Sequence, residues 1–504
     1  MRRISTGEAV ALRAGWKRRD ALRAAAVAAV TGPGLGILAA CGRATGAKGA
    51  STAQGGVLPV PQSGVVHLSF QANTQGLVSW NKTTQSVFQE FVDKNFNQNP
   101  QYKGLWATAF PWGGGSTQIA DDIAGAGYQD LWEFCCSDVP NAIHSGFAQP
   151  LDDLLKQDNI PTSLWSQGHI EANSMAGVLY GLPSYDGTMT TIYRQDILDQ
   201  LGLPYPDPTW TYQDAQRIWE QTTGTNKGGQ HRYGAHVYYE QEDIDWWLHG
   251  WGAQEMNAAQ DQATMASSEG IACYAWLQNL FMSNVISTGR GVKNLISEAA
   301  VFVMAHSAYV INAAEELGNK YKWDFLPNPH WPVHRACMET IDCYMFNAAT
   351  KHPNETWELM KWLNVGVPQG DGGYDPVWPK FQIEINLITP SLVSLWDYWA
   401  TTVVEVAPTL KGKSLQWWSQ PAIDGYARPQ LFYVYDWSNA ASIEQNWIEQ
   451  IRSGKVTASV GLRQMQQQVN AAEALGKSTA ARAASVAKSF PVVGKAMAPM
   501  PAGI

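Results

Sequence analysis

Cysteine is scarce in this 504-residue chain, which contains six cysteines. None stands in a CxxC pair or in a Cys/His cluster with zinc spacing, so we expect no metal site and no cofactor. Cys41 stands near the amino terminus, and the others are Cys135, Cys136, Cys273, Cys337 and Cys343. The sequence leaves open whether Cys337 and Cys343 form a disulfide. Buried thiols are the favoured interpretation, because strand geometry can hold the two side chains apart.

Basic runs are absent beyond residue 40. The net charge of the whole chain is -9, and residues 1–40 carry +5, so the remainder carries -14. An acidic chain without a basic patch is a poor partner for nucleic acid. The length leaves room for two lobes with an ample core.

A long uncharged hydrophobic run is also missing. Residues 21–40 are mildly apolar, but they contain Arg23 and several small or polar residues, which makes them a poor permanent membrane span. Arg18 and Arg19 precede this run. Residues 1–40 therefore resemble an export signal of the twin-arginine type.

The mildly apolar run ends in Leu-Ala-Ala-Cys-Gly, which resembles a lipobox with Cys41 as the lipidated residue. An ordinary amphipathic helix with a chance cysteine is the alternative. The residues that follow are mainly Gly, Ala, Ser and Thr, which bury too little apolar surface to fold. We expect residues 41–62 to form a lipidated, flexible tether that holds the folded protein at a membrane face.

Strand-like and helical patterns alternate after the tether. Strands are predicted at 65–71, 105–110 and 129–134, and helices at 83–96, 116–126 and 139–145. This alternation favours an α/β lobe with a mainly parallel sheet. Ligands of such sheets bind at the carboxyl ends of the strands. The turns there supply four candidate ligand-binding residues: Asn73, Gln75, Trp112 and Asp138.

The stretch from 175 to 215 is the most informative part of the chain. A short strand is predicted at 177–182, stopped by Pro183 because proline donates no ladder hydrogen bond. A polar turn is predicted at 184–188. A helix is then predicted at 195–201, ending at Gly202.

Further elements are predicted along the remaining chain from the same patterns. Thr209 is the expected cap of a helix at 212–221. Later strands are expected at 233–239 and 337–347, and later helices at 351–364, 392–406, 438–452 and 459–474.

Four short motifs in the informative stretch resemble extracellular solute-binding proteins of family 1, the sugar-binding type of ABC importers. They are Tyr180 to Pro183, Tyr193 to Asp196, Gly202 with Leu203, and Pro208 to Trp210. Arg194 and Gln195 replace an Asn-Lys pair of the family, which alters a helix start and leaves the architecture unchanged. The resemblance covers roughly residues 65 to 365.

The resemblance implies an α/β, periplasmic-binding-protein-like fold, with two α/β lobes joined by a hinge and a ligand cleft between them. The expected division is 63–185 plus 335–370 for lobe 1, 186–334 plus 371–475 for lobe 2, and 476–504 for a C-terminal tail. No family pattern covers 365–437 well, so the role of that section stays open.

Aromatic residues are abundant, with 23 tryptophans, and an indole face matches the apolar face of a sugar ring. Most of these tryptophans are expected in the core. The family keeps a sugar-stacking aromatic in the neighbourhood of residues 246–251, so the resemblance implies that one of Trp246, Trp247 and Trp251 stacks on a sugar, and Tyr309 stands where a family tryptophan would be. Asp342 has two open roles, bonding a ligand hydroxyl or capping a turn. The other candidate ligand-binding residues are Tyr185, Asp186 and Trp378.

The implied function is that of a monomeric, lipid-anchored binding protein outside the membrane, which captures a carbohydrate and delivers it to an ABC permease without chemistry. Two alternatives stay open. An extracellular glycoside hydrolase would need two carboxyl groups at a defined separation, and nothing in the sequence pairs them. The other alternative is a lipoprotein that binds a non-sugar solute such as a peptide.

Overall fold

The computed structural model of the chain describes residues 64–72, 82–111, 129–134, 139–144, 146–289, 291–348, 350–370 and 372–489. The predicted export signal, the tether with Cys41 and the helix at 116–126 lie outside the described residues. The described chain divides into two compact units. Unit 1 holds the residues up to Gln149, Gly181–Ser184 and Asp342–Pro390, and unit 2 holds Pro150–Tyr180, Tyr185–Ile341 and the residues from Ser391 onward. The lobe ranges predicted from the sequence differ from this division, chiefly at 150–180 and 371–390, and they stay a prediction.

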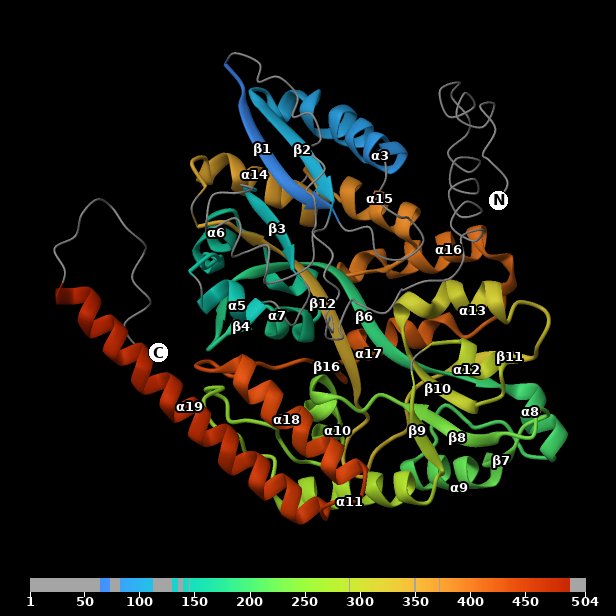
Figure 1. The fold of residues 1–504 in the computed structure, drawn as a ribbon. Helices are drawn as coiled ribbons and strands as arrows, with labels where there is room; N and C mark the ends of the chain where they lie inside the picture. The colour runs from blue at the N-terminus through green and yellow to red at the C-terminus, as the bar shows by residue number, and fades with distance from the viewer. Residues whose placement is uncertain are drawn as a thin grey trace. The chain divides into compact units, whose positions relative to one another are not determined.

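Unit 1 is built on a partly parallel sheet. Strand β1 (Val66–Ala72) pairs in parallel with β2 (Leu105–Pro111) along its whole length and with β3 (Leu131–Phe134) on its other side (Figure 1). Strand β12 (Cys337–Phe346) adds an antiparallel neighbour to β3. The helices of this unit are α3 (Lys82–Val92), α5 (Val139–His144), α14 (Pro353–Asn364) and α15 (Val377–Asn386).

Unit 2 is built on a mixed sheet. Strand β10 (Ala300–His306) pairs antiparallel with β6 (Gly181–Arg194) and in parallel with β8 (His231–Val237). Strand β9 (Ile286–Thr288) continues the parallel set beside β8, and β11 (Trp323–Leu326) pairs with β6. The remaining short strands of this unit are β4 (Ser174–Met175), β5 (Val178–Leu179), β7 (Gly224–Thr225) and β16 (Ala427–Pro429).

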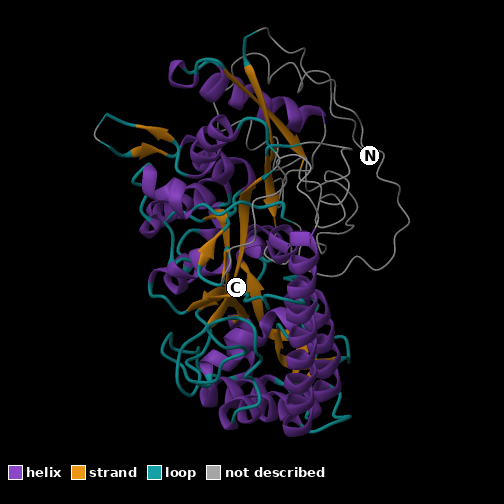
Figure 2. Cartoon of the chain, turned by 90° about the vertical axis from the view of Figure 1, so that its left-hand side faces the viewer, coloured by secondary structure: helices purple, strands orange, loops and turns teal. Residues whose placement is uncertain are grey.

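Helices pack against the strands of unit 2, and Figure 2 draws the helices in purple and the strands in orange. The α-helices are α6 (Asp152–Gln157), α7 (Gln167–Ala172), α8 (Gln195–Leu201), α9 (Tyr212–Thr222), α10 (Ile244–Gly250), α11 (Ser268–Met282), α12 (Lys293–Ile296), α13 (Val310–Glu316), α16 (Trp396–Val406), α17 (Gln420–Ile423), α18 (Trp437–Arg452) and α19 (Ala458–Ser489). In the part of the chain that the structure describes, no helix is both long and apolar enough to cross a membrane.

The predicted stop at Pro183 and the predicted turn at 184–188 are wrong, because β6 runs unbroken from Gly181 to Arg194. A proline biases the preceding residue towards extended backbone, so it removes one donor without bending the strand. The polar residues that suggested a turn find partners inside the fold. The Ser184 hydroxyl donates to Glu133 Oε1 at 2.8 Å and lies 3.0 Å from the Asp342 carbonyl oxygen.

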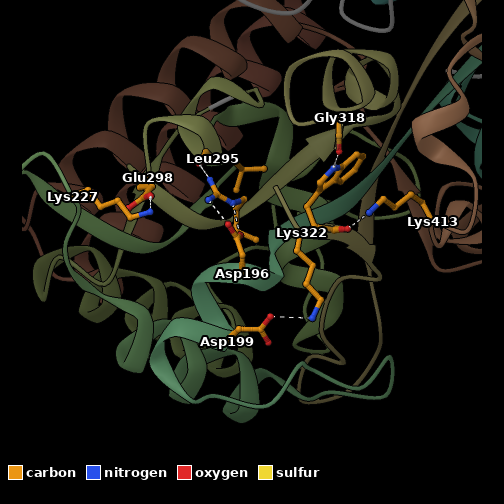
Figure 3. Close-up of polar contacts among 10 residues, drawn as sticks. Asp196, Asp199, Lys227, Leu295, Glu298, Gly318, Lys322 and Lys413 are labelled. Atoms are coloured by element: carbon orange, nitrogen blue, oxygen red, sulfur yellow. Dashed lines mark hydrogen bonds and ion pairs between the residues drawn. The ribbon is translucent and has the colours of Figure 1, made fainter. Parts of the chain in front are cut away.

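The predicted helix α8 is confirmed at both ends. It runs from Gln195 to Leu201, and Gly202 follows as its C-cap in a left-handed conformation with φ 67°. The side chain of Arg194 is buried just before the helix, where it binds both carboxylate oxygens of Asp196 at 2.7 and 2.8 Å and donates to the Leu295 carbonyl at 2.7 Å (Figure 3). The departure from the family motif at this position is therefore a buried structural contact.

The sequence predicted Thr209 as the cap of α9, but the structure shows that the cap is Thr211. The Thr211 side chain accepts a hydrogen bond from the Asp214 amide, and the Asp214 carboxylate accepts one from the Thr211 amide, which completes a capping box. Thr209 instead donates its hydroxyl proton to Asp207 at 2.6 Å. Both threonines fit the cap preference, and the acidic residue three positions later distinguishes the true cap.

The three cysteines that the structure describes are buried thiols. Cys337 and Cys343 lie on the same strand, β12, and form no disulfide with each other, so the prediction of buried thiols is confirmed for this pair. Cys135 and Cys136 lie outside the described residues.

Helices α18 and α19 lie side by side, and α19 extends past the end of α18 (Figure 1). The α19 helix continues to Ser489, into the range predicted as a tail. One acidic group of α18, the carboxyl of Glu444, is fully buried. Burial raises the pKa of Glu444 to about 8, and burial followed by the charge of Glu444 raises the pKa of the buried Glu255.

This burial predicts a pH-dependent stability. Because the pKa of Glu444 is higher in the folded chain than its ordinary value of 4.5, its contribution to stability is complete below 4.5 and is lost as pH rises through about 8. Urea unfolding across this window should give a falling free energy of unfolding. Glu444→Gln, which has no proton to lose, should flatten the fall, whereas Glu449→Gln on the partly exposed side of α18 should not. Equal slopes in all three proteins would contradict the prediction.

Candidate functional site

The carboxyl ends of three neighbouring strands of unit 2 meet at one edge of its sheet. Strand β8 pairs in parallel with both β9 and β10, so all three strands end on the same side of the sheet. Such an edge is the usual place for a ligand in an α/β sheet. The residues at and just after these ends include His236, Gly289, Gly291, His306 and Tyr309.

Strand β10 delivers Tyr309 to this edge. The strand is buried along almost its whole length, and His306 at its end begins a single 3₁₀ turn, Ser307–Tyr309, before α13. The His306 Nδ1 atom accepts a hydrogen bond from the Ala308 amide at 3.3 Å, which caps the turn. The position of Tyr309 is therefore set by the strand and by one histidine side chain.

A glycine segment packs against the Tyr309 ring. Gly291 has φ 89°, a left-handed conformation that favours glycine, and a Cβ atom there would lie 3.2 Å from Tyr309 Cε1. Gly289 lies against the imidazole of His236, where a side chain would overlap the ring. These two glycines let the chain after β9 approach both rings closely.

His236 is a neutral side chain at physiological pH. Its side chain is 6% exposed on β8, and burial lowers its pKa to about 4. It therefore brings no positive charge to this edge of the sheet, which suits a neutral polar ligand better than an anion.

A second contact of His306 reaches strand β12. Its Nε2 atom forms a hydrogen bond with the hydroxyl of Thr340, and the Thr340 hydroxyl lies 3.3 Å from the Gly187 carbonyl oxygen on β6. Gly187 leaves no room for a side chain, because a Cβ atom would overlap both His306 and Thr340. His306, Thr340 and Gly187 were missed by the sequence analysis, since no local pattern links residues this far apart.

The structure places the candidate ligand-binding residues in different surroundings. Tyr185 and Tyr309 lie in unit 2, with Tyr185 buried on β6 and Tyr309 half-buried at the strand edge described above. Asp186 is part of β6, and its side chain lies outside the described atoms. Four candidates lie outside the described residues: Asn73, Gln75, Trp112 and Asp138.

Trp246 and Trp247 lie inside unit 2. They are 1% and 0% exposed, their rings stack at 3.9 Å, and Trp247 also packs 4.8 Å from the ring of Trp331. The indole nitrogen of Trp247 donates to the Tyr238 carbonyl at 3.1 Å. Both rings are thus core residues of this unit, and a ligand-binding role for either stays a prediction.

The two candidates of unit 1 are also buried. Trp378 on α15 packs edge-on against Phe70 and Phe88, with ring centroids 5.3 and 5.9 Å apart. Asp342 is 1% exposed at the point where β12 enters unit 1. Among the residues that the structure describes, no group of three or more His, Cys, Asp or Glu side chains is placed to hold a metal ion.

Solved structures with the same architecture are known binding proteins. An ABC substrate-binding protein from Listeria monocytogenes in complex with cycloalternan is 14% identical, with a TM-score of 0.60 over 81% of this chain and 98% of its own. The sugar-binding protein MalE from Xanthomonas citri is 15% identical, with a TM-score of 0.61 over 84% of this chain and 100% of its own. A solute-binding protein from Thermotoga lettingae bound to α-D-tagatose is 15% identical, with a TM-score of 0.58 over 82% and 100%.

These similarities define the fold as periplasmic-binding-protein-like, with two α/β units that β6 and β12 connect. The family model for bacterial extracellular solute-binding proteins matches residues 79–364, which is more than half of the chain. The chain belongs to this family, and the resemblance in the sequence motifs is confirmed.

Proposed function

We propose that the chain captures a carbohydrate outside the membrane and delivers it to an ABC permease, without catalysing a reaction. The observation that carries the proposal is Tyr309, which β10 presents at the same carboxyl edge of unit 2 at which β8 presents a neutral His236. An aromatic ring and neutral polar groups suit a sugar, which offers apolar ring faces and uncharged hydroxyls. Family membership and the similar structures that hold cycloalternan and tagatose support the same class of ligand.

The proposed mechanism is capture followed by closure about a hinge. A ligand shifts a conformational equilibrium only when it binds one form more tightly, so the sugar must bind the closed form better than the open one. The permease would then sense closure. Export by residues 1–40, a lipid on Cys41 and a monomeric state complete the proposal, and mass spectrometry of the membrane-extracted chain tests the lipid.

A thermal-shift screen tests the proposal. The chain from residue 55 onward would be heated with cycloalternan, mannobiose, mannotriose and D-tagatose, with a peptide and a polyamine alongside. A ligand at about 100 times its dissociation constant should stabilise the folded chain by about 2.7 kcal/mol. Tyr309→Ala should remove the shift, whereas Tyr205→Ala should retain it, because Tyr205 is exposed and its hydroxyl bonds to Asp199 on α8.

Each outcome of the screen separates the proposal from its alternatives. A shift with one sugar, recovered intact, supports capture and names the ligand class. Cleavage of the sugar would replace capture by glycoside hydrolysis. A response to the peptide or polyamine alone would overturn the carbohydrate assignment and leave the family assignment in place.

A further inference from the structure

We infer that His306 is a positioning residue that couples the Tyr309 turn to strands β6 and β12, at the places where these strands pass from one unit to the other. The inference rests on the proposed function for the role of Tyr309. It assigns to His306, Thr340 and Gly187 a role that neither the sequence motifs nor the family assignment contains.

The hydrogen bonds of His306 form a directed chain. Its Nδ1 atom accepts from the Ala308 amide, so in the neutral ring the proton resides on Nε2. Nε2 therefore donates to the Thr340 hydroxyl, which in turn donates to the Gly187 carbonyl oxygen. Each member has the correct donor or acceptor for the next, and the chain runs from the Tyr309 turn to both strands.

These hydrogen bonds reach β6 and β12 close to the residues at which the two strands pass from one unit to the other. Thr340 precedes Ile341, the last residue of β12 that belongs to unit 2, and Gly187 follows Tyr185, the first residue of β6 in that unit. Thr340 is 4% exposed, so its bond is shielded from competing water. The missing side chain at Gly187 is what lets His306 and Thr340 approach the β6 backbone.

This arrangement has a direct functional consequence. A ligand that displaces the Tyr309 ring moves the Ala308 amide, and the displacement is passed through a rigid imidazole to two strands. Conversely, a change in the course of β6 or β12 alters the orientation of Tyr309. Ligand contact and strand geometry thus become coupled through one side chain.

Thr340→Val tests the coupling, because valine matches threonine in shape and lacks the hydroxyl. Hydrogen exchange of the unliganded chain should show peptide 307–316 exchanging roughly threefold to tenfold faster, the factor that one net hydrogen bond supplies. Thr340→Ser, which keeps the hydroxyl, should exchange like the unaltered chain. Thr190→Val is the matched control, since the hydroxyl of Thr190 on β6 donates to the Leu326 carbonyl at 2.7 Å, which is not a member of the hydrogen-bond chain through His306.

Sugar affinity gives a second readout. With the sugar that shifts the unaltered chain most, Thr340→Val and His306→Asn should each weaken binding roughly threefold to tenfold. The double variant should lose no more than the stronger single variant, because both changes interrupt one chain of bonds.

The two readouts separate the inference from the proposed function. If no sugar binds, the proposed function fails and hydrogen exchange still decides the coupling. If Thr340→Val exchanges at 307–316 no faster than Thr190→Val, the coupling is overturned, whatever the sugar affinity.

Discussion

Replacing Trp247 by alanine should cost the chain about 3 to 5 kcal/mol of unfolding free energy, the usual loss for a fully buried large aromatic side chain. Trp247 is 0% exposed, stacks on Trp246 and packs against Trp331. Truncation would leave a cavity among these rings and would also leave the Tyr238 carbonyl without its indole donor. A loss of this size is a large share of the stability of an ordinary domain.

Urea unfolding of the unliganded chain measures the effect. Trp447→Ala is the control, because Trp447 is only partly buried and its indole nitrogen bonds to Gln468 near the surface, so its loss should be about 1 kcal/mol. If Trp247→Ala instead weakened sugar binding with unchanged stability, Trp247 would be a ligand residue and its buried position would be wrong.

Replacing Arg194 by alanine should cost about 3 kcal/mol, because the change removes a buried guanidinium that bonds a partly exposed carboxylate and a buried carbonyl. The guanidinium is 1% exposed, binds Asp196 through two nitrogens, donates to the Leu295 carbonyl and lies 3.9 Å from the centroid of the Tyr321 ring. Alanine would leave the carboxylate and the carbonyl without this donor. The start of α8 and the segment around Leu295 would then lose their common contact.

Arg217→Ala is the control for Arg194→Ala, because it removes an arginine from an exposed ion pair. Arg217 pairs with Asp214 at 2.8 Å, but the two side chains are 61% and 44% exposed, so its removal should cost no more than about 1 kcal/mol. Arg194→Lys should fall between the two, since an ammonium group cannot bind two carboxylate oxygens and a carbonyl in the same planar geometry. Equal losses for Arg194→Ala and Arg217→Ala, measured by urea unfolding, would refute a structural role for the buried guanidinium.

Elements with strong local signals were predictable from the sequence. The carboxyl end of α8 follows from Gly202, and its start was predicted at the observed residue, Gln195. Predictions failed where a partner distant in sequence decides the structure. From the sequence alone, Ser184 was predicted to be part of a turn. In the fold it lies on a strand, and its hydroxyl donates to Glu133.

The candidate site was only partly predictable for the same reason. Tyr309 was found because it follows a buried strand and stands at a position where the family has an aromatic residue. His306 adjoins the same strand, but its role depends on Thr340 and Gly187, which are brought together by the pairing of strands. The burial of Trp246 and Trp247 depends on Trp331, which is equally remote in the sequence.

Each unit is built from separate segments of the chain, and this affects how the protein folds during its synthesis. Unit 1 needs residues up to Pro390, and unit 2 needs helices that follow Ser391, so neither is complete when only the first half of the chain has left the ribosome. At about 5 to 20 residues per second, a bacterial ribosome needs roughly 20 to 80 s to reach Pro390. Strand β3 ends at Phe134, whereas the segment of β12 that pairs with it begins only at Cys343, so β1, β2 and β3 are made long before that partner. The nascent chain therefore presents an open sheet edge for part of its synthesis, and such an edge is a site at which aggregation can begin.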